Sequence, residues 1–354
     1  MLDKVRDLII TNFLAILLGI VASGIMLLFL GENPISAYSI LITSVARDTY
    51  TFADIFVKAT PLMFTALAFA FTYKANLYNI GAQGQFYIGA VIAVASSLFL
   101  QNIMPGWLAL IITLILTLAG SGIWGAFIGF VKAKYNSNEF LISMMSTYVA
   151  LNIMNYLLRT HLMEAKGEYP QTDALNTSVW LPKIVPGTRL HIGFILAILA
   201  CIGTWVLLYK TPIGYRIRVV GYNAEAANMS GIDAKKLYVL AFFISGALAG
   251  AAGFTEVNGV QHMLVQGFNS DIGSAGIGIA ILANGNPIGI IFASILFGAL
   301  KVGGTIMGQM SAIPSSIIDL MEGFVMVFVI LAYFVRNWMD NNREKRKLQK
   351  AVVQ

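Results

Sequence analysis

Charged residues are scarce in this sequence, and long apolar runs take their place. Only 11% of the 354 residues are Asp, Glu, Lys or Arg, whereas 58% are hydrophobic. Water-soluble domains usually carry about a quarter charged residues, because their surface must be hydrated. The scarcity of charge excludes a soluble globular protein of this size, so the apolar side chains must face lipid or one another.

Residues with catalytic or metal-binding chemistry are also few. The single Cys201 can form neither an internal disulfide nor a zinc site by itself. His161, His191 and His262 are not at metal-ligand spacing. The sequence has no Gly-rich loop ending in Lys-Ser/Thr, which would bind nucleotide phosphates, and no Ser/His/Asp set. We therefore expect that the chain is not an enzyme and binds no cofactor, and that any ATP and Mg bind to a separate subunit.

The apolar runs are long enough to cross a membrane, which takes about 20 residues per helix. The uncharged run Ile272–Leu300 is too long for one crossing, and Asn284-Gly285-Asn286-Pro287 should break it into two helices. We predict an all-α polytopic membrane protein, one transmembrane domain over residues 1–354 with about ten helices. The other predicted spans are Ile9–Leu30, Phe56–Tyr73, Gln85–Leu100, Trp107–Val131, Phe140–Leu158, Ile192–Tyr209, Leu237–Phe254 and Ile317–Phe334.

The basic residues predict an orientation for these spans. Ten crossings put both termini on one side, and that side then holds most of the 23 Lys and Arg residues, including a basic tail over 336–354. Because such residues are concentrated in cytoplasmic connections, both termini are expected to be cytoplasmic. Residues 159–191 then form an external loop and residues 210–236 a cytoplasmic loop. Basic residues do not gather with aromatic ones on a soluble face, so we expect no nucleic-acid partner.

A polar segment, Lys74–Ala90, separates two of the apolar runs with two Asn, two Gln and three Gly residues. Polar backbone at membrane depth is tolerated only where it is buried in protein or lines a watery cavity. The segment indicates either an interrupted helix beside a solute pathway or an ordinary turn followed by a Gly-rich packing face.

Residues Asn79-Ile80-Gly81-Ala82-Gln83-Gly84-Gln85 resemble the Asn-Ile-Gly-x-Glu/Gln-Gly-Gln signature of the permease subunits of bacterial nucleoside and simple-sugar ATP-binding-cassette importers. Gln83 stands where many members of this branched-chain amino acid and sugar permease superfamily carry Glu. The resemblance, together with the polar and aromatic residues of later spans, gives a predicted translocation pathway. Its residues are Asn76, Asn79, Gly81, Gln83, Gly84, Gln85, Phe140, Asn152 and Phe268.

A second motif lies in the cytoplasmic loop. Asn223 is placed to cap a short helix that has Glu225 in its first turn and ends at Gly231, with Ala226 and Ala227 exposed. Thr211–Ile232 resembles the segment of the same family that docks on the ATPase, although a basic loop that only fixes topology is the alternative. The residues assigned to coupling are Arg216, Arg218, Gly221, Asn223, Glu225, Ala226, Ala227 and Gly231.

A third motif, Gly267–Gly289, resembles the family more loosely. Its position in the second half of the chain is similar to the position of Asn79–Gln85 in the first half. Interrupted segments at corresponding positions point to two loosely related halves around a central pathway.

Two further groups of residues each allow two interpretations. The stripe Phe140, Met144, Met145 and Tyr148 would either stack on a planar solute or serve helix packing. Asp319 and Glu322 share a helix face and lie either inside the protein or at the water interface.

The resemblance covers roughly residues 55–335 and implies a complete importer in the plasma (inner) membrane of a bacterium. Its parts would be this permease, a second related permease that forms a heterodimer with it, cytoplasmic ATPase subunits, and an extracellular substrate-binding lipoprotein. Nucleosides are the expected solute, with ribose-like sugars as the alternative. An ion-coupled secondary transporter is the rival from another class, since it needs no coupling loop, and a membrane scaffold is a third.

Overall fold

The computed structural model describes residues 17–29, 31–45, 47–268, 271–310, 320–321, 323–328 and 331–332. The chain divides into two compact units, Asp48–Ala299 and a second made of Met1–Arg47 with Leu300–Gln354. Among the described residues, helices dominate and β-pairing is confined to the isolated bridges Gln171–Val265 and Lys183–His191. The prediction of an all-α protein is confirmed.

The unit Asp48–Ala299 contains the helices that matter for the site. The predicted break at Asn284–Pro287 is confirmed, because α11 ends at Leu282 and α12 begins at Pro287. Residues Asn284 and Gly285 turn the chain with φ of 54° and 62°. The elements are α3 (Thr49–Tyr73), α4 (Ala82–Leu100), α5 (Gly106–Tyr135), α6 (Glu139–Leu158), η1 (Thr177–Val179), α7 (Gly193–Lys210), α8 (Pro212–Tyr222), α9 (Ala224–Met229), α10 (Ala234–Glu256), the π-helix η2 (Val257–Gln261), α11 (Ile272–Leu282) and α12 (Pro287–Met310).

The other unit contains a helix over Leu17–Phe29, the helix α2 (Pro34–Val45) and the part of α12 from Leu300 onward. The sequence analysis predicts no helix at α2, whose 12 residues are fewer than the about 20 that cross a membrane. The predicted last span, Ile317–Phe334, is described in part, and residues 320–321, 323–328 and 331–332 are helical as expected. Asp319 and Glu322 lie outside the described residues.

Seven helices of the described chain are long and apolar enough to cross a membrane, and three shorter apolar helices accompany them. The helix α3 is central, with 89% of its apolar window buried, whereas α5, α6 and α7 are each 28% buried. Glycines bring the helices close together: a Cβ on Gly89 of α4 would collide with the backbone of Gly250 in α10. Close backbone approach at small residues is the usual basis of helix packing in membranes.

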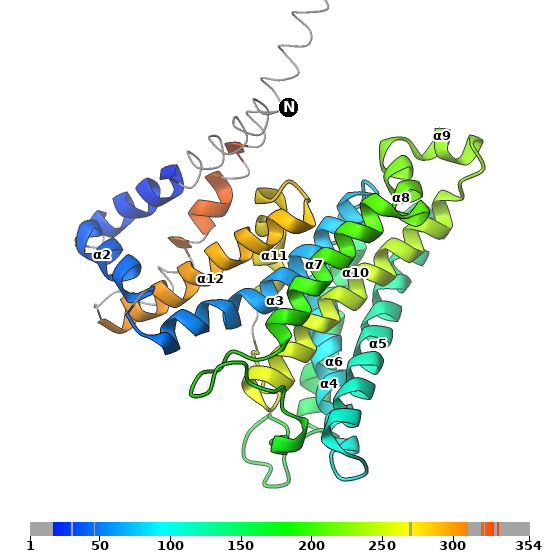
Figure 1. The fold of residues 1–354 in the computed structure, drawn as a ribbon. Coiled ribbons are helices and arrows are strands. Elements are labelled where there is room, and N and C mark those ends of the chain that lie inside the picture. Colours follow the sequence, from blue (N-terminus) through cyan, green and yellow to red (C-terminus); the bar gives the residue numbers. More distant parts are fainter. Residues whose placement is uncertain are drawn as a thin grey trace, which may run out of the picture. The chain divides into compact units, whose positions relative to one another are not determined.

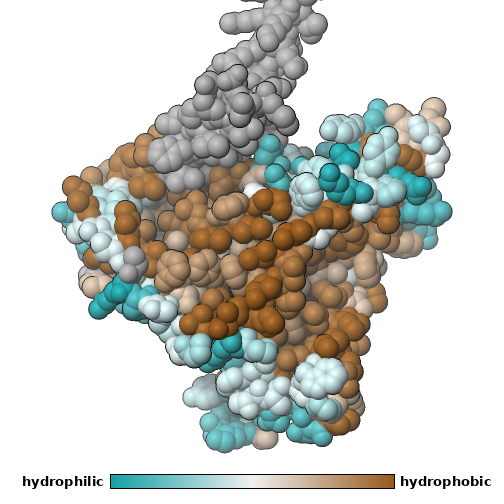
Figure 2. Space-filling model, viewed as in Figure 1, coloured by the Kyte–Doolittle hydropathy of each residue, from teal (hydrophilic) through white to brown (hydrophobic). Residues whose placement is uncertain are grey.

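Polar residues gather at two opposite ends of this unit. The helices α8 and α9 project from one end, which we call the α9 end, and the loop of residues 159–191 covers the other, which we call the loop end (Figure 1). In Figure 2 the surface between them is mostly hydrophobic, and hydrophilic side chains lie at both ends. This is the arrangement of a unit that crosses a membrane with its two connecting regions in water.

Candidate functional site

The first polar segment is non-helical backbone enclosed by the bundle. Asn79 is fully buried, and its amide Nδ2 donates to Gln85 Oε1 at 2.8 Å and to Ser245 Oγ at 2.7 Å. Its Oδ1 accepts from the backbone N–H of Gly81 at 3.0 Å. Ser245 lies roughly 16 Å along α10 from its first residue, at 1.5 Å per residue. The segment therefore enters the bundle from the α9 end, and α4 begins well below that end.

The second interrupted helix, α11, begins beside the start of α4. Gln83 in the first turn of α4 accepts a hydrogen bond from the backbone N–H of Gly273 through its Oε1. Thr65 of α3 donates to the carbonyl oxygen of Ile272 at 3.2 Å. The first and third motifs, far apart in the sequence, therefore meet at the N-termini of two shortened helices.

Phe268, the last described residue before Asn269, joins this meeting point. Its side chain is 3% exposed and stacks on Phe86 of α4, with ring centroids 5.3 Å apart and planes at 11°. The sequence-predicted Asn79, Gln83, Gln85 and Phe268 are thus brought together, whereas Asn76 lies exposed in the turn after α3 with φ of 57°.

Two glycines of the first motif allow α6 to approach. A Cβ on Gly81 would lie 2.8 Å from the carbonyl oxygen of Ser143, and one on Gly84 would lie 2.7 Å from the Cα of Thr147. Both distances are shorter than real Cβ contacts, so a larger residue at either position would push α6 away. These glycines therefore pack helices together, as expected for a Gly-rich packing face. They do so beside the buried polar groups of Asn79 and Gln85.

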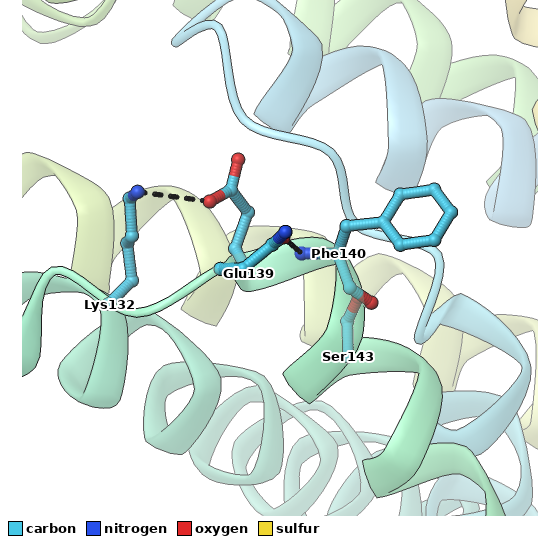
Figure 3. A network of polar contacts seen from close by, with 5 residues as sticks. Lys132, Glu139, Phe140 and Ser143 are labelled. Atoms are coloured by element: carbon cyan, nitrogen blue, oxygen red, sulfur yellow. Dashed lines mark hydrogen bonds and ion pairs between the residues drawn. The ribbon is translucent and has the colours of Figure 1, made fainter.

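The start of α6 is fixed by polar contacts that Figure 3 shows. Lys132 near the end of α5 pairs with Glu139 at 3.1 Å, and Asn138 caps the helix by accepting from the N–H of Phe140 at 3.0 Å. The ring of Phe140 points away from this ion pair and is 43% exposed. The other members of the predicted stripe, Met144, Met145 and Tyr148, are also exposed, as is Asn152. Against the described part of the chain, this stripe is therefore not buried in helix packing.

The predicted coupling helix exists as α9. The Oδ1 of Asn223 accepts from the N–H of Ala226 at 3.0 Å, Glu225 lies in the first turn, and Gly231 follows the last turn with φ of 78°. The side chains that stand out most from this end are Tyr222 and Met229, which are 89% and 92% exposed. The sequence analysis gave these two residues no role. Their positions could have indicated one, because Tyr222 directly precedes the capping Asn223 and Met229 is the last residue of the short helix.

One detail of that prediction is corrected. Ala226 is exposed, as expected, but Ala227 is fully buried and belongs to a core cluster with Phe71, Leu208 and Phe242. A six-residue helix lying on a bundle must turn one side inward, and the small Ala227 fills that side. Ala227 therefore anchors α9 and is not part of its exposed face.

The residues of α8 attach the projecting end to the bundle. Arg216 is exposed, whereas Arg218 donates through Nε to the carbonyl oxygen of Leu208 at 3.1 Å and lies over the ring of Tyr209 at 5.1 Å. A Cβ on Gly221 would collide with the carbonyl oxygen of Lys74. The assigned coupling residues thus divide into an exposed group and an anchoring group.

The loop end is folded onto η2 and the residues that follow it. The N–H of Leu181 donates to the carbonyl oxygen of Asn258 at 2.9 Å, and the N–H of Leu175 to that of His262 at 2.8 Å. Burial, with a smaller effect of His262, lowers the pKa of His191 to about 4. Burial, with Lys183 and Arg189 nearby, also lowers the pKa of His262 to about 4. Both imidazoles are therefore neutral near pH 7.

Glu256 is a buried acid that the sequence analysis did not identify, because the span predicted there ends two residues earlier, at Phe254. It lies at the end of α10 with 4% of its surface exposed. In the part of the chain that the structure describes, no three His, Cys, Asp or Glu residues are grouped to hold a metal ion.

The chain is similar to known membrane permeases. The family described as "Branched-chain amino acid transport system / permease component" matches residues 51–330. The chain is 30% identical to the guanosine ABC transporter permease protein NupP of Bacillus subtilis (strain 168), over 95% of this chain and 97% of NupP. It is 29% identical to the nucleoside ABC transporter permease protein NupB of Lactococcus lactis, over 94% and 93%. It is 28% identical to the glucose ABC transporter permease protein TsgB13 of Haloferax volcanii, over 93% and 88%.

Proposed function

Because this chain belongs to the family of permease components of branched-chain amino acid transport systems, we propose that it forms the solute pathway of a nucleoside importer. The observation that carries the proposal is the meeting of α4 and α11 at the buried Asn79, Gln83 and Gln85. Two interrupted helices that begin side by side inside a membrane bundle provide polar groups where a continuous helix would offer none.

The likeness to two relatives named for guanosine and nucleosides favours nucleosides as the solute. An aromatic and amide-bearing face, Phe140, Tyr148 and Asn152 on α6, fits a planar base that also forms hydrogen bonds. The similarity to a glucose permease gives the alternative, a simple-sugar importer of the same construction.

The partners follow from the same proposal. The exposed α9 end docks on cytoplasmic ATPase subunits that bind ATP and Mg, and the loop end faces the extracellular binding lipoprotein. A second related permease completes the pathway along the exposed face of α6. Both termini then lie in the cytoplasm and the chain in the bacterial inner membrane.

Uptake in whole cells tests the solute. Deleting the gene for this chain should abolish uptake of radiolabelled guanosine, and returning the wild-type gene should restore it, with labelled glucose uptake unchanged. Loss of glucose uptake with guanosine uptake intact would favour the sugar importer. Guanosine uptake that survives deletion of the ATPase partner would favour an ion-coupled transporter.

A pull-down tests the docking surface. Affinity purification of the tagged chain in mild detergent should recover an ATPase subunit, and the double variant Tyr222→Glu/Met229→Glu should recover about tenfold less. Both residues are almost fully exposed, so the variant should fold and reach the membrane in normal amounts. The matched control is Tyr169→Glu at the loop end, where a 63% exposed tyrosine receives the same charge. Equal loss in the control, or no loss in the double variant, contradicts this assignment of α9.

A further inference from the structure

Lys74 lies where three segments of the α9 end meet. It follows α3, and the polar segment that leads to Asn79 and α4 begins with it. Its ammonium Nζ is 3.4 Å from the carbonyl oxygen of Asn284, in the turn between α11 and α12. A Cβ on Gly285 of that turn would lie 3.1 Å from the same Nζ. The side chain of Lys74 therefore reaches from one interrupted segment to the other.

The backbone of Lys74 is in contact with the projecting helices. Gly221, in the last turn of α8, lies so close that any side chain there would collide with the carbonyl oxygen of Lys74. Ala75 and Leu77 share a core cluster with Val220 of α8 and Ala227 of α9. Lys74 and its neighbours are therefore among the parts of the bundle that a displacement of α8 and α9 would reach directly.

The polar segment holds α11 at both of its ends. At the N-terminus, Gln83 accepts the N–H of Gly273, one of the donors that a helix leaves without an intrahelical partner. Beyond the C-terminus, the ammonium of Lys74 lies 3.4 Å from the carbonyl oxygen of Asn284, in the turn two residues after α11 ends at Leu282. Along its length, Gly276 packs against the backbone of Thr65 in α3. The helix α11 thus packs on α3, and the segment 74–83 contacts it at its start and in the turn that follows its end.

We infer that Lys74 is the positioning residue that transmits movement of α8 and α9 to the interrupted helix α11. The inference rests on the proposed function, because it assumes that α9 docks on an ATPase. It adds a specific link: the carbonyl oxygen of Lys74 contacts Gly221, and its ammonium contacts Asn284 in the turn that follows α11. The lysine touches no solute in this assignment, so it should affect the rate of transport and not solute binding.

Kinetics of labelled guanosine uptake in cells that lack the native gene test the link. Lys74→Gln should lower the maximal uptake rate about fivefold, the size of a favourable charge interaction at a helix end, with KM unchanged. Lys74→Arg keeps the positive charge and should restore most of the rate. The ATPase subunit should still co-purify with Lys74→Gln, because the exposed face of α9 is unaltered. A pull-down from the same membranes measures this.

The outcomes separate the inference from the proposed function. If the wild-type gene does not restore guanosine uptake, the proposed function fails. If it does, and Lys74→Gln transports like the wild type, or Lys74→Arg is as impaired as Lys74→Gln, the inference is wrong. The matched control is Lys134→Gln, which removes one charge from the end of α5 at the same end of the unit. An equal loss in Lys134→Gln would also contradict the inference.

A backbone variant provides a second test if Lys74→Gln does not accumulate in membranes. Gly221→Ala should force α8 away from Lys74 and lower the maximal rate, while the ATPase subunit still co-purifies. Gly203→Ala in α7 adds the same methyl group where no atom lies within 4 Å, and it should transport normally. Normal transport by Gly221→Ala would overturn the link.

Discussion

The two ends of the unit Asp48–Ala299 are built in opposite ways. At the α9 end, two short helices project, and Tyr222 and Met229 stand almost fully exposed. At the loop end, 33 residues (159–191) without a long helix fold back onto η2 and the residues after it, and they bury His191, Val179 and Leu181. A surface that exposes large apolar side chains is typical of a contact with another protein. A surface whose large apolar side chains are buried by its own loop offers less for a partner to bind. This difference is what the proposed docking of an ATPase subunit at the α9 end requires.

The largest expected effect is a difference in stability between a substitution on the buried face of α9 and one on its exposed face. Ala227→Glu places a carboxylate in the core cluster with Leu208 and Phe242, and burying an unpaired charge costs several kcal/mol, so the chain should unfold or fail to accumulate. Ala226→Glu, one residue away and exposed, should leave the thermal stability in detergent unchanged but reduce recovery of the ATPase subunit. Equal stability of the two variants would mean that α9 does not pack on the bundle as described.

The loop end should respond to pH, because it buries a histidine. His191 has its pKa lowered from 6.5 to about 4, so between these values the unfolded chain binds a proton that the folded chain excludes. Its stabilising contribution is complete above pH 6.5 and falls by about 3 kcal/mol as the pH drops toward 4. The apparent Tm in detergent, followed from pH 7 to 5, should fall less steeply in His191→Asn, whose side chain keeps an acceptor for the N–H of Gly193.

The exposed His161 provides the control for this measurement. His161→Asn should leave the pH dependence of the apparent Tm as it is in the wild type. If both variants have the same slope, the loop end is not closed over His191.

The smallest effect is expected at the cap of α9. Asn223→Ala removes the side-chain acceptor for the N–H of Ala226 and should destabilise α9 by about 1 kcal/mol. Hydrogen–deuterium exchange in residues 224–232 should become about fivefold faster, while exchange in α10 stays the same. Asn223→Asp keeps an acceptor and should exchange like the wild type, and faster exchange in both variants would show that the cap is unimportant.

What the sequence predicts well is local chemistry. Asn223, Glu225 and Gly231 define α9 because each residue acts on backbone groups within one or two turns. The break at Asn284–Pro287 follows in the same way from turn residues, and the apolar runs define the long helices by length alone.

The features that the sequence does not predict depend on contacts between residues far apart in the chain. A small alanine suits a surface or a core, so only the position of α9 on the bundle decides that Ala227 is buried. The depth at which α4 begins depends on hydrogen bonds to Ser245 and Gly273. The folding of the loop end depends on hydrogen bonds to Asn258 and His262. The burial of Glu256 was missed because the helix is longer than its apolar run.

The bond between Asn79 and Ser245 sets an order of events in biosynthesis. The two residues are 166 positions apart, and a chain emerges from the ribosome beginning at its N-terminus. Helices α3 to α7 are therefore made before α10 can supply Ser245. Until then, the amide of Asn79 lacks its hydrogen bond to Ser245 in the partly built bundle. The polar centre of the protein is completed only after most of the chain has entered the membrane.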